Sequence, residues 1–511
     1  MSIAPPNLAA LYNGEAVHLD HVPRLPVEQL RETVIEAVKN GLRVVSFFAM
    51  ESSDPARTDL VAVLANDLNG GLLVGIAPIE GGVLASLTPQ CPQVHLFERE
   101  IAEQFGIRIE GHPWMKPVRF AARLGGAPGA SGSATNGRPL IGVADFYRVE
   151  GEQVHEVAVG PVHAGVIEPG HFRFQCHGEQ VFHLEISLGY QHRGVEEALA
   201  GGPHKLTLHH METAAGDTSI AHAWAYCQNL EALASTHVPA SAHVIRSIAL
   251  ELERLANHTG DLGALAGDVG YLPTMSFCGR IRGDFLNMTA EICGNRFGRS
   301  LVRPGGTGFG LDPPRAEALL KRLDTARKDV TKAVDLLWLS SSVMARFENA
   351  GAVSLDDCLQ LGLVGPAARA CGVERDVRQD HPTGAYQFTH IPVSTAYGGN
   401  VSSRAFVRWL EMQRSLAFIQ ERLQSLPENG ALSRPGRLAP RSLAVSLIEG
   451  WRGEVCHVAV TGDDGRFLRY KITDPSFHNW MGLAMALRDQ QISDFPLCNK
   501  SFNLSYCGHD L

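Results

Sequence analysis

The stretch GGAPGASGSATNGRP, residues 125–139, decides how this chain is organised. It consists mostly of small and polar residues, and its few apolar side chains follow no periodic pattern. Segments of this composition behave as flexible linkers, because they offer little apolar surface to bury. We therefore predict a linker over residues 125–150, between a short first unit over residues 1–124 and a long second unit over residues 151–511.

The first unit mixes helical and strand patterns. The stretch PVEQLRETVIEAVKNG (26–41) places apolar residues at helical spacing and ends in a glycine that suits a helix C-cap. A buried strand over 42–50 and a helix over 95–107 are expected as well, whereas the apolar runs 60–67 and 72–79 fit either a strand or a helix. The first unit is therefore predicted to be a small domain of mixed helices and strands.

The second unit begins with strands and continues mainly as helices. Residues 171–176 and 180–190 alternate between apolar and polar, whereas residues 242–258 and 314–347 keep helical periodicity. Near the C-terminus, GDDGR at 462–466 is a hairpin turn signal between two strand-like runs. The predicted fold class is α+β: a small N-terminal domain of mixed helices and strands, linked to a large, mainly helical domain with small peripheral β-sheets.

Composition and charge argue against several classes of protein. The net charge of −9 argues against nucleic acid as the main partner, because a phosphate backbone selects for a basic surface. No apolar stretch is long enough to cross a bilayer, and the first twenty residues lack the pattern of a signal peptide. The glycines of GGTGFG (305–310) lack the spacing of a dinucleotide site. We expect a soluble protein without a nicotinamide site, reaching membranes only through partner subunits.

Cysteine and histidine spacing does not predict a metal site. The ten cysteines include no Cys-x-x-Cys pair, and the closest two, Cys498 and Cys507, are nine residues apart. This spacing differs from that of zinc, iron–sulfur and redox sites, and it favours reduced, mostly buried thiols. Thirteen of the 22 histidines lie between residues 155 and 258, but only His209 and His210 are adjacent, which does not match structural zinc.

Several motifs, in the same order as the two units, resemble one family. FEREIAEQFGIRIEGHPWMKPVRF (97–120) resembles a motif of the smaller hydrophilic subunit beside the quinone module of complex I; an amphipathic helix with a Gly-Pro turn is the alternative. GPVHAGVIEPGHFRFQCHGE (160–179), LGYQHRGVEEAL (188–199) and DFPLCNKSFNLSYCGHDL (494–511) resemble the larger neighbouring subunit, which shares ancestry with the large subunit of nickel–iron hydrogenases. The fused order and the string Glu-Pro-Gly-His-Phe-Arg are closest to the formate-hydrogenlyase type.

The resemblance implies that the ligands of a nickel–iron centre are missing. In the family this centre is held by two Cys-x-x-Cys pairs, because soft metal ions prefer soft sulfur ligands. Flanking residues place the first pair at Ala215 and Thr218, and the second at Ser505 and Gly508. None of the four is a cysteine, and Cys507 lies one position away. We therefore expect no nickel–iron centre and no other metal bound by this chain.

The resemblance extends in part to the quinone pocket of complex I. His163 matches the first of two family histidines, whereas the second falls at Ile167 and the family tyrosine falls at Gly216. The family aspartate is kept as Asp268. The resemblance implies that His163 contacts a quinone carbonyl or relays protons, and that Asp268 carries protons with a pKa raised by burial. A structural histidine and an N-cap or turn acid are the alternatives.

A charged stretch, RACGVERDVRQDHP (369–382), adds further candidates. In the family it lines the buried site near the metal or the quinone headgroup. The resemblance therefore implies Arg369 and Asp380 as residues of a quinone-like pocket. A salt-bridge network that includes Asp376 and Arg378 is the alternative.

Taken together, the resemblance implies a subunit of a membrane-associated oxidoreductase complex, active only within that complex at the cytoplasmic face of the inner membrane. It would form a pocket beside a 4Fe–4S cluster held by a partner small subunit, with membrane subunits as further partners. The chemistry would be reduction of a quinone-like acceptor or coupled proton handling. Two alternatives remain open: a non-catalytic scaffold, and a nickel enzyme with unusual ligands.

Overall fold

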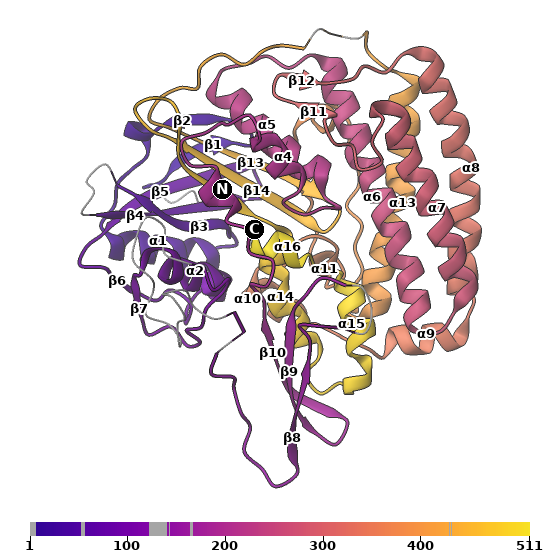
Figure 1. Cartoon of the computed structure of the whole chain (residues 1–511), viewed down its shortest axis with the longest axis horizontal. Coiled ribbons are helices and arrows are strands. Elements are labelled where there is room, and N and C mark those ends of the chain that lie inside the picture. Colours follow the sequence, from indigo (N-terminus) through magenta and orange to yellow (C-terminus); the bar gives the residue numbers. More distant parts are fainter. Residues whose placement is uncertain are drawn as a thin grey trace.

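The computed structural model describes residues 7–511 except residues 53–56, 122–140, 143, 164–166, 429 and 431. Most of the predicted linker therefore lies outside the described residues. Figure 1 shows a sheet-rich region on one side, a bundle of long helices on the other, and the C-terminal sheet between them. The predicted α+β class, with a small N-terminal region and a larger helical part, is confirmed.

The first unit is built on a four-stranded antiparallel sheet. In spatial order it contains β1 (Ala9–Tyr12), β5 (Gly71–Ile79), β4 (Thr58–Asn66) and β3 (Arg43–Glu51). The two apolar runs with ambiguous patterns are therefore strands, and they do not alternate because the sheet is covered on both faces. One face is covered by the two predicted helices, α1 (Val27–Lys39) and α2 (His95–Phe105).

The other face of this sheet packs against a second sheet formed near the C-terminus. That sheet contains, in spatial order, β15 (Phe467–Thr473), β14 (Gly453–Thr461), β13 (Ser442–Gly450) and β2 (Ala16–His18). Every residue of β13 and β14 is buried, because one face meets β3 to β5 and the other meets the helices. This sheet thus lies inside the molecule, and β2 from the N-terminal region completes its edge.

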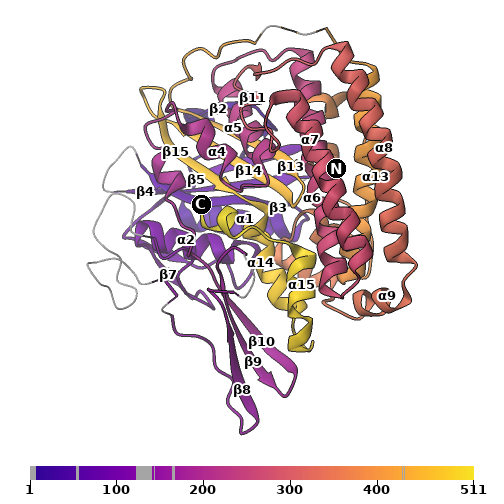
Figure 2. The ribbon, with the colours of Figure 1, turned by 45° about the vertical axis from the view of Figure 1, so that its right-hand side comes forward.

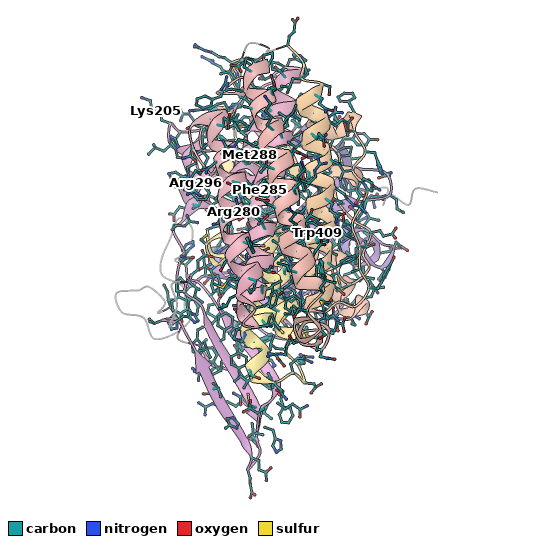
Figure 3. The ribbon with its side chains drawn as sticks, turned by 90° about the vertical axis from the view of Figure 1, so that its right-hand side faces the viewer. Lys205, Arg280, Phe285, Met288, Arg296 and Trp409 are labelled. Atoms are coloured by element: carbon teal, nitrogen blue, oxygen red, sulfur yellow. The ribbon has the colours of Figure 1, made fainter. Side chains whose placement is uncertain are left out.

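The helical domain is dominated by long helices that lie side by side, as Figure 3 shows from the helical face. They are α6 (Ala240–Asp268), α7 (Leu272–Cys293), α8 (Pro313–Trp338) and α13 (Val401–Gln424), whereas α5 (Ser219–Leu233) lies against β13 and β14. The predicted helix 314–347 is divided into α8 and α9 (Ser341–Glu348) by a break at residues 339 and 340. The break falls where a run of serines begins, and serines favour helix ends. In the described part of the chain, no helix is long and apolar enough to span a bilayer.

A three-stranded antiparallel sheet projects from the body of the molecule (Figures 1 and 2). It contains β8 (Val154–Val159), β9 (His171–His177) and β10 (Gln180–Ser187), so the two strands predicted there are confirmed. The shorter elements are β6 (Val83–Ala85), β7 (Arg108–Glu110), β11 (Val302–Arg303), β12 (Gly306–Thr307), α3 (Val195–Ala198), α4 (Thr207–Glu212), α10 (Leu355–Leu361), α11 (Gly365–Arg369), α12 (Val377–Asp380), α14 (Pro475–Ala486), α15 (Phe495–Phe502), α16 (Tyr506–Asp510) and the 3-10 helices η1 (Leu19–His21), η2 (Pro92–Val94), η3 (Gly384–Phe388) and η4 (Ile492–Asp494).

Candidate functional site

The four positions that the sequence resemblance matches to nickel ligands, residues 215, 218, 505 and 508, come together between the start of α5 and α16. All four are buried. Arg193 joins the two segments, because its Nη2 donates to the carbonyl oxygens of Ala214 at 2.9 Å and Cys507 at 3.2 Å. We call residues 215, 218, 505 and 508 the four-residue site.

An ion pair lies directly beside the first two positions. The Nη1 and Nη2 atoms of Arg452 meet the two carboxylate oxygens of Asp217 at 2.6 and 2.8 Å, the bidentate geometry that makes such pairs strong. Nη1 also donates to Thr218 Oγ1 at 3.2 Å. Burial opposes ionisation of Asp217, but the charge and hydrogen bonds of Arg452 outweigh it and hold the pKa of Asp217 below its usual value.

A second carboxylate lies against the other pair of positions. Asp474 is the N-cap of α14, where its Oδ1 accepts from the Ser476 amide at 2.8 Å. Its Oδ2 lies 3.0 Å from His222 Nε2. A Cβ atom placed on Gly508 would lie only 2.7 Å from Asp474 Cγ. A cysteine at 508 would therefore require Asp474 or the backbone to move.

A chain of buried side chains leads inward from Asp474. His222 Nδ1 lies 3.0 Å from His457 Nε2, and His457 Nδ1 lies 2.9 Å from Tyr470 Oη. Burial, together with the neighbouring His222, holds the pKa of His457 well below its usual value. The chain joins α5 to β14 and β15, so the four-residue site is tied to the central sheet.

The atoms available at the four-residue site do not match the ligand set of a nickel–iron centre. Thr218 Oγ1 is already bonded to Asp217 and Arg452, and Ser505 Oγ accepts from the Gly508 amide at 2.9 Å. Both atoms are hard oxygen donors, whereas soft metal centres such as nickel–iron prefer thiolate ligands. Burial raises the pKa of Cys507 to about 11, which favours its thiol form. Among the described residues, no group of three histidine, cysteine or acidic side chains could hold a metal.

His163 lies close to the four-residue site. Its Nε2 is 3.1 Å from the Gly170 carbonyl oxygen. Gly170 packs beneath the ring of Tyr506, at the start of α16. The carboxylate of Glu168 accepts from the amides of Tyr506 at 3.3 Å and Cys507 at 3.1 Å, so Glu168 is likewise held against α16.

Asp268 lies farther away, as the last residue of α6. It is not an N-cap, and its side chain is exposed at the helix end. Partial loss of surrounding water raises its pKa, although the charge of Lys500 acts in the opposite direction. Asn257 of α6 donates to the Asp217 carbonyl oxygen at 3.0 Å, and eleven residues of helix separate it from Asp268, or about 16 Å. Asp268 and His163 share no contact in the described part of the chain.

Arg369 and Asp380 occupy two other environments. Arg369 is buried in an ionic network, 2.8 Å from both Glu411 and Glu449, as expected for the salt-bridge alternative. Asp380 is half-buried at the end of α12, where it accepts from the Asp376 amide at 2.8 Å. Burial raises the pKa of Asp380 to about 6. The four predicted pocket residues therefore do not form one cluster, and their functional roles stay predictions.

Comparison of the sequence with known proteins places the chain in a family. The family models of the respiratory-chain NADH dehydrogenase 30 Kd and 49 Kd subunits match residues 24–129 and 268–440. The carbon monoxide-induced hydrogenase of Rhodospirillum rubrum is 30% identical over 353 residues, which are 68% of this chain and 97% of that protein. The chain belongs to the family of complex I 49-kDa subunits and hydrogenase large subunits.

Two further relatives match this chain over parts of both units. Hydrogenase-4 component G of Escherichia coli is 29% identical over 441 residues, covering 82% of this chain and 74% of that protein. The NADH-quinone oxidoreductase C/D protein of Bdellovibrio bacteriovorus is 25% identical over 490 residues, covering 88% of this chain and 87% of that protein. The resemblance to a fused, complex I-like and hydrogenase-related subunit is thus confirmed.

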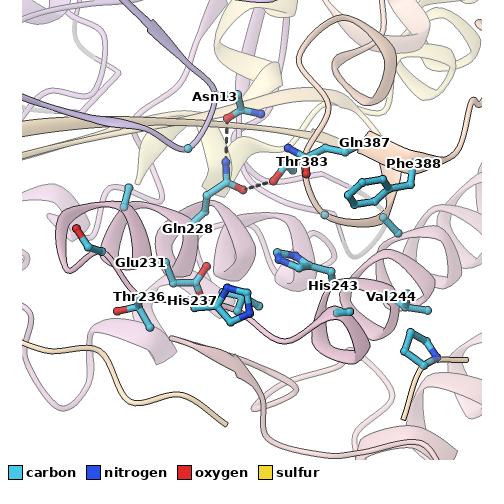
Figure 4. Close-up of a pocket in the computed structure, with 18 of the residues that line it drawn as sticks. Asn13, Gln228, Glu231, Thr236, His237, His243, Val244, Thr383, Gln387 and Phe388 are labelled. Atoms are coloured by element: carbon cyan, nitrogen blue, oxygen red, sulfur yellow. Dashed lines mark hydrogen bonds between the residues drawn. The ribbon is translucent and has the colours of Figure 1, made fainter. Parts of the chain in front are cut away.

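A cavity of about 670 Å³ lies at the opposite end of α5 from Thr218 (Figure 4). At its back, Gln228 donates to Asn13 Oδ1 at 3.0 Å and accepts from Thr383 Oγ1 at 2.9 Å. His243 also lines the cavity, its buried Nδ1 has no hydrogen-bond partner among the described residues, and burial lowers the pKa of His243 to about 4. None of the residues predicted from the sequence lines this cavity.

The sequence alone did not predict the polar side chains that lie beside or behind the four-residue site. They are Asp217, His222, Arg452, His457 and Asp474. Only Asp474 carries a local signal, because an aspartate directly before a proline is typical of a helix N-cap. Each of the other four has a partner in a segment more than two hundred residues away, which no local pattern reveals.

Proposed function

We propose that this chain is a subunit of a membrane-associated, complex I-like assembly that works without a nickel–iron centre. It forms the wall of a pocket beside a 4Fe–4S cluster of a partner small subunit. The chemistry at that pocket is reduction of a quinone-like acceptor or coupled proton handling. Membrane partner subunits hold the chain at the cytoplasmic face of the inner membrane.

The side chains beside the four-residue site are the main support for this proposal. The Asp217–Arg452 ion pair and the Asp474–His222 contact replace soft sulfur with charged oxygen and nitrogen groups. Groups of this kind are poor ligands for the metals of a hydrogen catalyst, and a carboxylate–imidazole contact such as Asp474–His222 is suited to holding or passing on a proton. The relatives named for hydrogenase or NADH-quinone oxidoreductase subunits support the assignment to a redox complex.

His163 is proposed to handle a proton at the edge of this pocket. The Gly170 carbonyl oxygen can only accept a hydrogen bond, so Nε2 of His163 carries the hydrogen in their 3.1 Å contact. Nδ1 is then the ring atom that takes up or releases a proton toward an acceptor. This arrangement supports a role in proton transfer to a reduced quinone-like molecule.

Asp268 is proposed to supply protons along α6. Asp261 lies two helical turns before it, and the Asn503 amide donates to Asp261 Oδ1 at 2.6 Å. Arg452 Nε in turn donates to the Asn503 carbonyl oxygen at 2.5 Å. These contacts join Asp261 to the four-residue site, and Asp261 lies on the same face of α6 as Asp268, about 10 Å nearer that site.

Metal analysis tests the first part of the proposal. The tagged chain is purified from membranes with its partners, and nickel is measured per chain by mass spectrometry. We expect nickel far below one atom per chain, while iron follows the partner small subunit. One nickel per chain would contradict the proposal and favour an enzyme with unusual ligands.

Substitution of Asp268 tests the second part. Asp268→Asn removes the titrating group, so quinone reduction by the intact complex is expected to fall about tenfold or more with normal assembly. Asp335→Asn, at an exposed acid of α8, is the matched control and is expected to leave activity unchanged. Full activity of Asp268→Asn in a normally assembled complex would favour the non-catalytic scaffold.

A further inference from the structure

The cavity of about 670 Å³ beside the end of α5 has the size and the wall of a small-molecule site (Figure 4). Its wall is formed by the turn after β1, the end of α5 with its connection to α6, the start of α6, η3, and the end of α13 with the residues after it. Sites for small molecules commonly measure about 300–1,000 Å³ and combine a largely apolar wall with a few polar groups. The apolar part of this wall comes from Ala232, Val238, Ala240, Val244, Ala385, Phe388 and Pro427.

Among the described residues, two charged side chains line the cavity besides its histidines, and only one of them has a buried partner. Glu231 accepts from both terminal nitrogens of Arg246, at 3.1 and 2.6 Å, so its charge is balanced inside the protein. Arg422 pairs with Glu421, whose side chain is 60% exposed, and exposed pairs of this kind are weak. The Nε atom of Arg422 is buried and has no hydrogen-bond partner in the described part of the chain. The cavity therefore presents a positive charge that is only partly balanced.

The guanidinium of Arg422 is held at the cavity by aromatic rings. It lies 5.9 Å from the centre of the Phe418 ring, which stacks on Tyr386 of η3 at 5.3 Å. Tyr386 Oη donates to the buried Glu251 carboxylate at 2.6 Å, so this support is anchored in the core. α6 begins at the cavity with Ala240 and has no acidic side chain in its first turn, so the partial positive charge of this helix end adds to that of Arg422. An anionic group bound here would meet favourable charge.

η3 also presents an aromatic ring at the edge of the cavity. Tyr386 points inward and is 5% exposed, whereas Phe388, two residues later, is 86% exposed. Figure 4 shows Gln387 and Phe388 of η3 on one side of the cavity and His243 of α6 on the other. Because Tyr386 fixes η3 from the core side, the Phe388 ring is carried on a firmly held segment. An exposed aromatic face beside a cavity is a surface on which a second planar ring can stack.

Two neutral polar side chains of the wall have hydrogen-bonding capacity to spare. Gln228 is 6% exposed, its Nε2 donates to Asn13, and its Oε1 accepts from Thr383, which leaves its second N–H without a partner among the described residues. The ring of His243 is neutral at pH 7, because burial lowers its pKa to about 4, and its Nδ1 has no partner either. Unpaired buried polar groups are costly, so a bound molecule that hydrogen-bonds to them gains affinity.

We propose that this cavity binds a small aromatic anion, in which a carboxylate or phosphate group is attached to a planar ring. The anionic group lies beside Arg422 and the start of α6, and the ring stacks on Phe388. Polar substituents of the ring hydrogen-bond to Gln228 and His243. Because the turn after β1 also lines the cavity, the bound molecule contacts both the N-terminal unit and the helical domain.

Ligand titration of the complex, purified from membranes through the tagged chain, tests this proposal. Binding of benzoate and phenyl phosphate is followed by saturation-transfer NMR, and the tighter of the two identifies the anionic group. We expect saturable binding of benzoate, and binding at least about tenfold weaker for benzamide, its neutral analogue, which cannot form a charge-assisted hydrogen bond through an anion. Cyclohexanecarboxylate keeps the charge but lacks the aromatic ring, and we expect it to bind about threefold more weakly than benzoate. If neither anion binds saturably, or if benzamide or cyclohexanecarboxylate binds as tightly as benzoate, the proposal is wrong.

Three variants assign the binding to this cavity. Arg422→Met is expected to weaken benzoate binding about tenfold and to leave benzamide binding unchanged, because only the anion interacts with the charge. Phe388→Ala is expected to weaken the binding of both about threefold through loss of the stacked ring. Arg108→Met is the matched control, since Arg108 is an exposed arginine of β7 that pairs with Glu110 much as Arg422 pairs with Glu421, and it should bind like the wild type. Wild-type affinity for benzoate in Arg422→Met or in Phe388→Ala would overturn the assignment to this cavity.

Discussion

At the scale of single residues, the environment of the four-residue site is set by buried charges that perturb one another. Glu253 of α6 lies beneath the start of α5, where its Oε2 accepts from the Ile220 amide at 2.8 Å. Burial raises the pKa of Glu253 to about 8, and the negative charge of Asp217 adds to the increase. This carboxyl is therefore largely protonated at neutral pH, in contrast to its neighbour Asp217.

The raised pKa of Glu253 predicts how stability depends on pH. The folded chain holds this proton more tightly than the unfolded chain, so the free energy of unfolding falls as pH rises from about 4.5 to about 8. Glu253→Gln keeps the hydrogen-bond acceptor and cannot ionise. We expect it to be more stable than the wild type by on the order of 1–3 kcal/mol at high pH, with little difference at about pH 5.

Thermal unfolding across the pH range measures this effect. Glu197→Gln, at an exposed acid of α3, is the control and should shift the curve equally at all pH values. A Glu253→Gln effect of the same size at both ends of the pH range would show that ionisation of this carboxyl does not influence stability.

At the scale of elements, the start of α14 combines a helix cap with a link to another helix. Asp474 satisfies the Ser476 amide with one oxygen and meets His222 of α5 with the other. Asp474→Asn keeps a good cap but loses the charge, whereas Asp474→Ala loses both. We expect both variants to be less stable than the wild type, the alanine variant by about 1 kcal/mol more than the asparagine variant.

Urea denaturation resolves this order, and Asp312→Ala is its matched control. Asp312 caps the exposed start of α8 through the Arg315 amide, and its second oxygen meets only the exposed Arg315 side chain at 3.1 Å, not a buried partner like His222. If Asp474→Ala costs no more than Asp312→Ala, the contact with His222 contributes nothing to stability.

Prediction from the sequence succeeded for elements with one-sided burial and failed where burial or partners depend on distant segments. The helix of 26–41 and the strands around Gly178 are confirmed, because their patterns reflect one covered face. β4 and β5 stayed ambiguous, since covering on both faces removes the alternation that marks a strand. The site positions followed from motifs, but Arg452 and its carboxylate partner could not be paired before the fold was known.

At the scale of the whole molecule, buried ion pairs join the first unit to the C-terminal sheet. Lys471 of β15 meets Glu100 of α2 at 2.7 Å and Glu196 of α3 at 3.0 Å. Arg43 of β3 likewise meets Glu454 of β14 at 2.5 Å. A buried charge that loses its partner is strongly destabilising. These pairs therefore specify how the two units pack against each other as well as holding them together.

Removing one partner of this junction should therefore destabilise the whole chain. Lys471→Met removes the cation that Glu100 and Glu196 share and leaves each carboxylate with a single arginine partner, and we expect it to cost about 3 kcal/mol. Lys321→Met, which breaks the exposed pair with Glu317 on α8, is the control and should cost less than about 1 kcal/mol. If the two variants lost the same amount of stability in thermal unfolding, the buried ion pairs would not contribute to holding the two units together.

The pairing of β2 with β13 has a consequence for how the chain is made. Residues 16–18 leave the ribosome early, and residues 442–444, to which they pair, leave it late. At ordinary rates of synthesis this gap lasts about 20 to 90 seconds. During that time the nascent chain exposes an unpaired strand and the uncovered apolar face of β3 to β5, and both promote aggregation. Production of this protein will therefore depend on how well the cell shields a nascent chain until its last strands emerge.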